Sequence, residues 1–120
     1  TGAANAEAIV NGGFRMDCGK RGVVGQAMHF AENITKSDEY AGNGGDKKTV
    51  LLVRVYVGRL AHCTSVNPTP DEVAALRAQC TDQGCGAVLV DRLAAKGTFR
   101  EWAVLKASQC QPEFLVRYKS

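Results

Sequence analysis

Five stretches of this chain have the length and composition of β-strands. Thr49–Gly58 is the clearest, because it is almost continuously apolar and rich in β-branched residues, a pattern typical of a central strand covered on both faces. In Pro112–Lys119 apolar and polar residues alternate, and the Pro stands at the start of the strand, where its missing N–H is tolerated. The other predicted strands are Ala27–Ala31, Ala87–Val90 and Thr98–Lys106.

Two further stretches predict helices. Ala3–Val10 consists largely of strong helix formers. Asn67–Cys80 contains the second helix, with Thr69 as its N-cap, Pro70 at the first helical position and Glu72 completing a capping box. The residues of this helix expected to face the core are Val73, Leu76 and Cys80.

The predicted elements together describe one α+β domain of 120 residues. Polar, glycine-punctuated stretches at Arg15–Val24, Ala41–Lys48 and Ala94–Gly97 are expected to be loops or turns. No apolar run approaches the roughly 18–20 residues of a membrane span, and no signal peptide is visible. We therefore expect an intracellular protein, cytoplasmic or nuclear, without membrane contact.

The charged residues and cysteines give no sign of nucleic-acid or metal binding. Fifteen Lys and Arg against twelve Asp and Glu leave a formal net charge of +3, without a basic block. The five cysteines are an odd number, and Cys80 and Cys85 are too widely spaced for a zinc-binding Cys-x-x-Cys pair. We therefore expect free thiols in a reducing compartment and no metal site.

Candidate chemistry gathers where the predicted strand Ala27–Ala31 turns into a short helix. Thr35 is the expected N-cap of that helix, with the carboxylate of Asp38 three residues later near its positive end. His29 lies at the strand end, and Lys36, Ser37 and Tyr40 lie on or just after the first helical turn. Because Ser37 and Tyr40 are three apart, they share one helix face, and with His29 they would suit a flat, amide-bearing ring held between two aromatics. Judged on spacing alone, a core-facing Tyr40 and a capping Ser37 are the simpler interpretation.

This stretch resembles a signature of the poly(ADP-ribose) polymerase-like ADP-ribosyltransferases, G-x-G-x-Y-F-A-(D/E)-x-x-S-K-S-x-x-Y, which forms their nicotinamide pocket. The chain matches it at Phe30-Ala31-Glu32-Asn33 and at Lys36-Ser37-Asp38-Glu39-Tyr40. It departs at His29, which stands where the family has its first Tyr.

Both ends of the chain carry further parts of the resemblance. The start is similar to H-G-(T/S)-x-x-x-N-A-x-x-I-x-x-x-G-F, so we expect the family's His-Gly pair immediately before Thr1 and the chain to be an N-terminally truncated catalytic domain. The tail is similar to E-(Y/W/F)-x-V-x-D-x-x-Q-x-x-P-E-(Y/F)-L-(I/V)-x-(Y/F). The matching residues are Thr1, Asn5, Ile9, Gly13 and Phe14 at the start, and Glu101, Trp102, Val104, Gln109, Pro112 to Val116 and Tyr118 in the tail.

The resemblance implies an ADP-ribosyltransferase fold, a mixed sheet split around an NAD cleft with short flanking helices. It implies transfer of ADP-ribose from NAD to protein side chains, with release of nicotinamide and without a metal. Residues 1–120 would form a single catalytic domain. A catalytically inactive module that binds NAD, ADP-ribose or a protein partner is the alternative. Transfer to a nucleic acid or a small molecule is a weaker third option, since no basic groove is evident.

The resemblance also assigns roles to individual residues. Glu101 aligns with the family's catalytic Glu, which holds a ribose hydroxyl and stabilises the oxocarbenium-like transition state. The NAD-binding residues would be Thr1, His29, Lys36, Ser37 and Tyr40, with Lys20 or Arg21 near the pyrophosphate. Without the resemblance, Glu101 is a solvated strand-end carboxylate, and Glu113 is expected to be structural. An imidazole can become charged near neutral pH, so NAD affinity should fall as the pH drops through the titration of His29.

Overall fold

The computed structural model describes residues 3–16, 19–41, 47–93 and 98–119, which form an α+β fold. The predicted α+β class is therefore confirmed. Thr1 and the predicted turn Ala94–Gly97 lie outside the described residues. The elements, in chain order, are α1 (Ala3–Gly12), β1 (Lys20–Gly22), β2 (Gly25–Ala31), α2 (Ile34–Glu39), β3 (Lys47–Val55), β4 (Arg59–Cys63), α3 (Pro70–Thr81), β5 (Cys85–Asp91), β6 (Arg100–Val104), the 3₁₀ turn η2 (Ala107–Gln109) and β7 (Cys110–Lys119).

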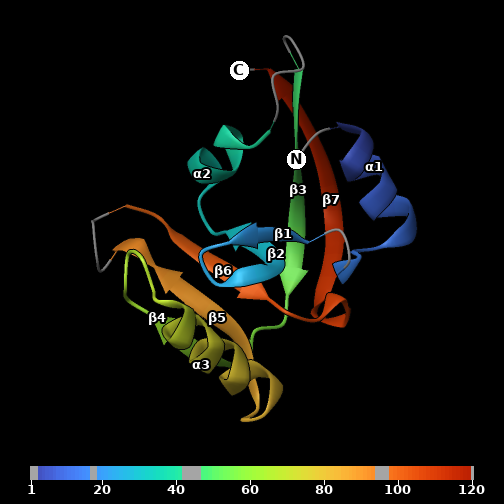
Figure 1. Ribbon diagram of the computed structural model, residues 1–120. Coiled ribbons are helices and arrows are strands. Elements are labelled where there is room, and N and C mark those ends of the chain that lie inside the picture. The colour runs from blue at the N-terminus through green and yellow to red at the C-terminus, as the bar shows by residue number, and fades with distance from the viewer. Residues whose placement is uncertain (1–2, 17–18, 42–46, 94–97, 120) are drawn as a thin grey trace.

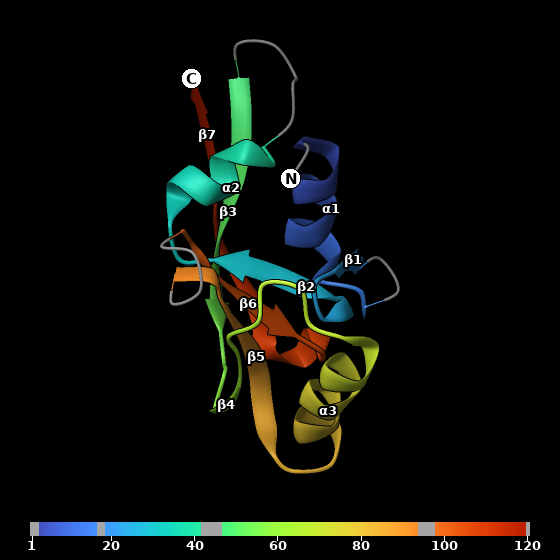
Figure 2. The same ribbon diagram turned by 60° about the vertical axis from the view of Figure 1, so that its left-hand side comes forward.

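The strands within these ranges form two sheets (Figure 1). One sheet has the order β1-β2-β6-β5-β4 and is mixed, because β4 and β5 run parallel while the other neighbours run antiparallel. The parallel pair is joined by α3, the crossover that parallel strands require, and α3 packs on both of them (Figure 2). The second sheet is the antiparallel pair β3-β7.

The core lies on both faces of the five-stranded sheet. On one face Leu76 and Cys80 of α3 pack against β4 and β5 residues that include Val88 and Val90. On the other face Val53 and Val55 of β3 pack against Met28, Ala87 and Val104. The β3-β7 pair therefore lies on the opposite face from α3, and Figure 1 shows α1 and α2 on either side of that pair.

Two strands occur where the sequence pattern does not predict them. β1 lies in the stretch Arg15–Val24 that was expected to be irregular; its three residues pair with β2, and Gly25 supports the turn with a φ of 86°. β4 follows the predicted strand Thr49–Gly58 and pairs with β5 alone among the described strands. Both strands are short and carry no alternation of apolar and polar residues long enough to be recognised.

The prediction that Thr49–Gly58 is a central strand covered on both faces is wrong. β3 pairs with β7 alone among the described strands, and Leu52 is 57% exposed opposite Phe114, which is 63% exposed. Pro112 also differs from expectation: it lies inside β7, opposite Val53 and next to a register shift. Because the ladder is already irregular there, the missing N–H of the Pro is accommodated.

The helix signals in the sequence are confirmed for α3 and corrected for α2. In α3 the Thr69 hydroxyl accepts a hydrogen bond from the Glu72 backbone N–H at 3.2 Å, and the Glu72 carboxylate accepts the Thr69 N–H at 3.5 Å. The N-cap of α2 is Asn33, whose Oδ1 accepts the N–H of Thr35 at 2.9 Å, so the predicted cap at Thr35 is wrong. Asn caps as well as Thr does and stands immediately before the first helical residue.

Two further observations concern membrane-spanning helices and the cysteines. The described part of the chain contains no helix that is both long and apolar enough to cross a membrane. Cys63, Cys80, Cys85 and Cys110 are free thiols, and Cys18 lies outside the described residues. Burial raises the pKa of the Cys110 thiol to about 11, so this thiol stays protonated at neutral pH.

Candidate functional site

A cleft of about 620 Å³ is the candidate site. Its walls come from β1, β2, β5 and β6 of the larger sheet, from β3 of the smaller sheet, and from α1 and α2. Five of the six predicted site residues line this one cleft, although they are separated by up to 72 positions along the chain: His29, Lys36, Ser37, Tyr40 and Glu101. The sixth, Thr1, lies outside the described residues.

The β2-β6 ladder determines how His29 and Glu101 are placed. Ala31 at the end of β2 is the register partner of Glu101, and His29 is the partner of Ala103. His29 and Glu101 are therefore diagonal neighbours on one face of the sheet, about 7–8 Å apart between Cα atoms. No hydrogen bond or ion pair joins the Glu101 carboxylate to another described residue, so the carboxylate is available to a ligand in the cleft.

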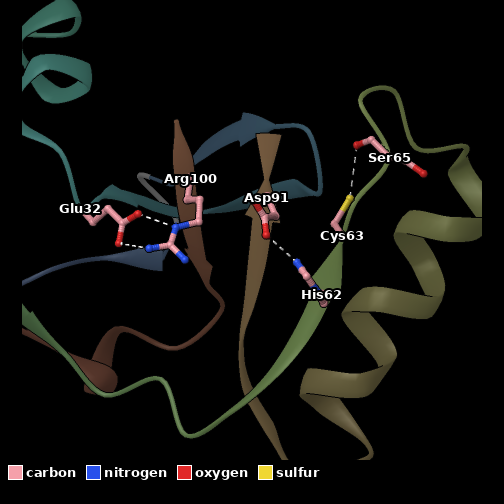
Figure 3. A network of polar contacts seen from close by, with 6 residues as sticks. All are labelled: Glu32, His62, Cys63, Ser65, Asp91 and Arg100. Atoms are coloured by element: carbon pink, nitrogen blue, oxygen red, sulfur yellow. Dashed lines mark hydrogen bonds and ion pairs between the residues drawn. The ribbon is translucent and has the colours of Figure 1, made fainter. Parts of the chain in front are cut away.

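An ion pair beside Glu101 joins β6 to Glu32, the residue that directly follows β2. The Arg100 guanidinium donates from Nε and Nη2 to the two carboxylate oxygens of Glu32, at 2.5 and 2.9 Å (Figure 3). One strand further, Asp91 at the end of β5 binds His62 at 2.9 Å (Figure 3). The fork-like guanidinium pair fixes direction as well as distance, so it orients the strand end that carries Glu101.

The short helix α2 is anchored to the β3-β7 pair by Asp38. The Tyr118 hydroxyl donates to the Asp38 carboxylate at 2.5 Å, and Lys48 Nζ donates to both of its oxygens at 3.1 Å. These bonds, the Tyr118 bond foremost, hold the pKa of Asp38 below its ordinary value, and the same bond raises the pKa of Tyr118 to about 12. A six-residue helix is too short to be stable alone, so this anchor helps to position Ser37 and Tyr40.

Replacing Tyr118 by Phe should raise the pKa of Asp38 partway toward its ordinary value, with Lys48 still holding it down. Because the folded-state pKa of Asp38 is depressed, its stabilising contribution is present above about pH 4 and is lost as the pH falls through the folded value. The variant should therefore lose part of this acid sensitivity. A pH titration of the Asp38 carboxyl carbon by NMR measures the shift, with Tyr56→Phe, whose ring is 61% exposed, as the control. An unchanged Asp38 titration in Tyr118→Phe would contradict the anchor.

The side chains of α2 that line the cleft interact with one another. Lys36 Nζ donates to Glu39 at 3.1 Å and lies 5.3 Å from the centre of the Tyr40 ring. The Glu39 bond raises the pKa of Lys36, and the negative charge of Glu101 contributes to the same shift. Tyr40 is 60% exposed at the C-terminal end of the helix, so the simpler interpretation from spacing, a core-facing Tyr40 and a capping Ser37, does not hold.

The imidazole of His29 packs directly on Gly22 of β1. A Cβ at position 22 would lie 2.6 Å from Cε1 and 2.7 Å from Nε2 of His29, so any other residue at this position would force the ring to shift. His29 Nε2 is buried and has no hydrogen-bond partner among the described residues. A buried polar nitrogen without a partner is uncommon in folded proteins, and a water molecule or a ligand can supply that partner.

Positive charge dominates the described lining of the cleft. Arg15, Arg21, Lys36 and Arg92 line it, against Glu101 as the one acid among these described residues. The sequence pointed to Arg21 but not to Arg92, which follows β5 and carries no motif signal. The side chain of Lys20, the alternative to Arg21, lies outside the description. An anionic ligand is therefore favoured by charge.

Two other expectations concerned Glu113 and metal binding. Glu113 lies on β7 and forms an ion pair with Arg54 at 3.1 Å, away from the cleft lining. Within the described ranges, no group of three or more His, Cys, Asp or Glu side chains is arranged to hold a metal ion. Neither a protein-family model nor a curated protein matches this chain in sequence.

Proposed function

We propose that this domain has an ADP-ribosyltransferase fold and transfers ADP-ribose from NAD to protein side chains, releasing nicotinamide. One observation carries the proposal: the residues of two separate motif-like stretches, Lys36-Ser37 with Tyr40 and the distant Glu101, line the same cleft. The division of the strands into two sheets, both of which contribute to that cleft, supports the same fold.

The cleft offers groups for both ends of NAD. His29 and Tyr40 supply aromatic faces for the nicotinamide ring, and the Ser37 hydroxyl can hydrogen-bond its carboxamide. Arg21 can pair with the pyrophosphate, since a guanidinium suits phosphate oxygens in geometry and charge. These contacts would hold the glycosidic bond of NAD beside Glu101.

Glu101 supplies the chemistry in this proposal. The bond between C1 of the nicotinamide ribose and the ring nitrogen breaks, nicotinamide leaves with the electron pair, and the ribose gains oxocarbenium character. The Glu101 carboxylate stabilises that positive charge and holds a ribose hydroxyl. A nucleophilic atom of the acceptor then forms the new bond to C1.

The second candidate function is an inactive module that binds NAD, ADP-ribose or a protein. It is favoured by the imidazole of His29, which provides less stacking area than the family's phenol and is packed against Gly22. The experiment that separates the two is release of labelled nicotinamide from NAD. NAD binding by calorimetry without any nicotinamide release would select the binding module.

Replacing Gly22 by Ala should weaken NAD binding by about 2- to 10-fold, because the new methyl group forces the His29 ring out of its position beneath the ligand. Calorimetric titration with NAD measures the change. The double variant Gly22→Ala, His29→Ala tests whether Gly22 acts through His29. In a chain that already carries His29→Ala, adding Gly22→Ala should not weaken NAD binding any further. An equal loss in the presence and absence of the ring would show that Gly22 acts through something else.

A further inference from the structure

The helix α3 contributes no residue to the described lining of the cleft, and the proposed NAD contacts give it no role. One of its side chains nevertheless reaches the β1-β2 hairpin, from which part of the cleft wall is built. Arg77 Nη1 donates to the backbone carbonyl of Val24 at 3.0 Å and to that of Gln26 at 2.8 Å. A single guanidinium nitrogen therefore bridges the carbonyls on the two sides of Gly25, which supports the hairpin turn with its positive φ.

The contact between α3 and the hairpin turn is close and has two parts. A Cβ at Gly25 would lie 3.3 Å from Arg77 Nη1, so the guanidinium packs directly on the turn. The side chain of Val24 is fully buried in one cluster with Leu76 and Cys80 of α3. Apolar packing of this kind attaches the turn to the helix but is not directional. The two hydrogen bonds from a charged donor supply the direction.

Gln26 connects Arg77 to the strand that lines the cleft. Its backbone carbonyl accepts from Arg77, while its side-chain Nε2 donates to the carbonyl of Gly19 at 3.1 Å. Gly19 and the β1 residues Arg21 and Gly22 line the cleft. β1 has three residues and pairs, among the described strands, with β2 alone, so its own ladder holds it weakly. The position of this part of the cleft wall therefore depends on contacts outside the ladder.

We propose that Arg77 is a positioning residue for NAD binding, which holds the β1-β2 hairpin in place from the face of the sheet that α3 covers. This inference rests on the proposed function. The hairpin carries Gly22, on which the His29 ring packs, and Arg21, the proposed partner of the pyrophosphate. Because Arg77 is absent from the described lining of the cleft, its loss should raise Kd and KM for NAD and leave kcat almost unchanged.

The test compares Arg77→Met, which keeps an apolar stem without a donor, with Arg77→Lys, which keeps a charged donor. In calorimetric titration with NAD, Arg77→Met should weaken binding about 3- to 10-fold, and Arg77→Lys should recover most of that loss. Arg59→Met, at an exposed arginine of β4 outside the cleft lining, is the matched control and should leave the affinity unchanged. In nicotinamide release the loss should appear in KM, with kcat changed less than about 2-fold.

Hydrogen exchange of backbone amides in the ligand-free chain separates positioning from a general loss of stability. In Arg77→Met the amides of the β1-β2 ladder should exchange about 5-fold faster or more, while those of the β2-β6 ladder keep their rates. An equal acceleration in both ladders, with a lower midpoint of unfolding, would show that Arg77 only stabilises the fold and would overturn the proposal.

The binding and activity measurements decide separate questions. If Arg77→Met binds NAD as tightly as the unaltered chain does, the positioning role is overturned, whether or not nicotinamide is released. If Arg77→Met weakens NAD binding but the unaltered chain releases no nicotinamide, the positioning role stands and the proposed transfer reaction fails. If the unaltered chain binds no NAD, both proposals are overturned.

Discussion

Replacing Glu101 by Gln should lower kcat for nicotinamide release from NAD by about 10²- to 10⁴-fold, the range observed for loss of a positioned acid, base or electrostatic group. Gln keeps the size and hydrogen-bonding shape of Glu but removes the negative charge that opposes the developing oxocarbenium ion. Because no hydrogen bond or ion pair joins the Glu101 carboxylate to another described residue, the substitution breaks no such bond and removes only the charge interaction of Glu101 with Lys36. KM for NAD should therefore change little, and the loss should appear in kcat.

The matched control is Glu113→Gln, which makes the same chemical change on β7. Glu113 pairs with Arg54 away from the cleft, so its loss should change kcat less than about 2-fold, as expected for an ion pair at the surface. Both variants should be measured by release of labelled nicotinamide, with thermal unfolding as a check on folding. Equal activity of Glu101→Gln and the unaltered chain would remove Glu101 from the reaction.

Replacing Gly86 by Ala should destabilise the fold by about 1–3 kcal/mol. A Cβ at this position would clash with the carbonyl oxygen of Val57 and lie 2.6 Å from its carbonyl carbon, and a backbone carbonyl cannot move aside as a side chain can. The clash would lie where Val57, just after the end of β3, packs against Gly86 in β5. The same point is fixed by Gln109, whose Nε2 donates to the carbonyls of Gly86 at 2.7 Å and Tyr56 at 2.6 Å.

Urea unfolding measures this loss, and Gly12→Ala is the control. A Cβ at Gly12, in the last turn of α1, meets nothing within 4 Å, so the substitution should be neutral or stabilise by up to about 1 kcal/mol. Equal midpoints for the two variants would show that Val57 and Gly86 are not in contact in solution.

The elements predicted correctly are those whose formation is indicated by a few neighbouring residues in the sequence. The capping box of α3 involves residues three apart, and the β-branched run of β3 identifies a strand by itself. The partners of β3 depend on tertiary packing, and so the exposure of Leu52 could not be predicted from a run that is apolar throughout. The strand β4 lacks a local pattern and is stabilised by its pairing with β5.

The candidate site divides in the same way. Ser37, Tyr40 and Glu101 were predicted from the resemblance of short stretches to the motifs of a family, and all three line one cleft in the structure. Arg92 and Gly22 were missed because no local sequence pattern marks them, and only their neighbours in the folded chain draw attention to them. Arg92 becomes a candidate through a buried nitrogen without a partner, and Gly22 through the imidazole that occupies the space of an absent side chain.

The pairing of β3 with β7 has a consequence for how the protein is made. Residues 50–53 of β3 form part of the cleft wall, and β3 pairs, among the described strands, with residues 110–119 alone. This ladder joins segments about sixty positions apart, so its closure carries a large loop entropy and comes late in folding. A nascent chain on the ribosome therefore lacks a complete cleft until β7 has emerged. Ligand binding should be absent from shortened translation products that end before residue 110.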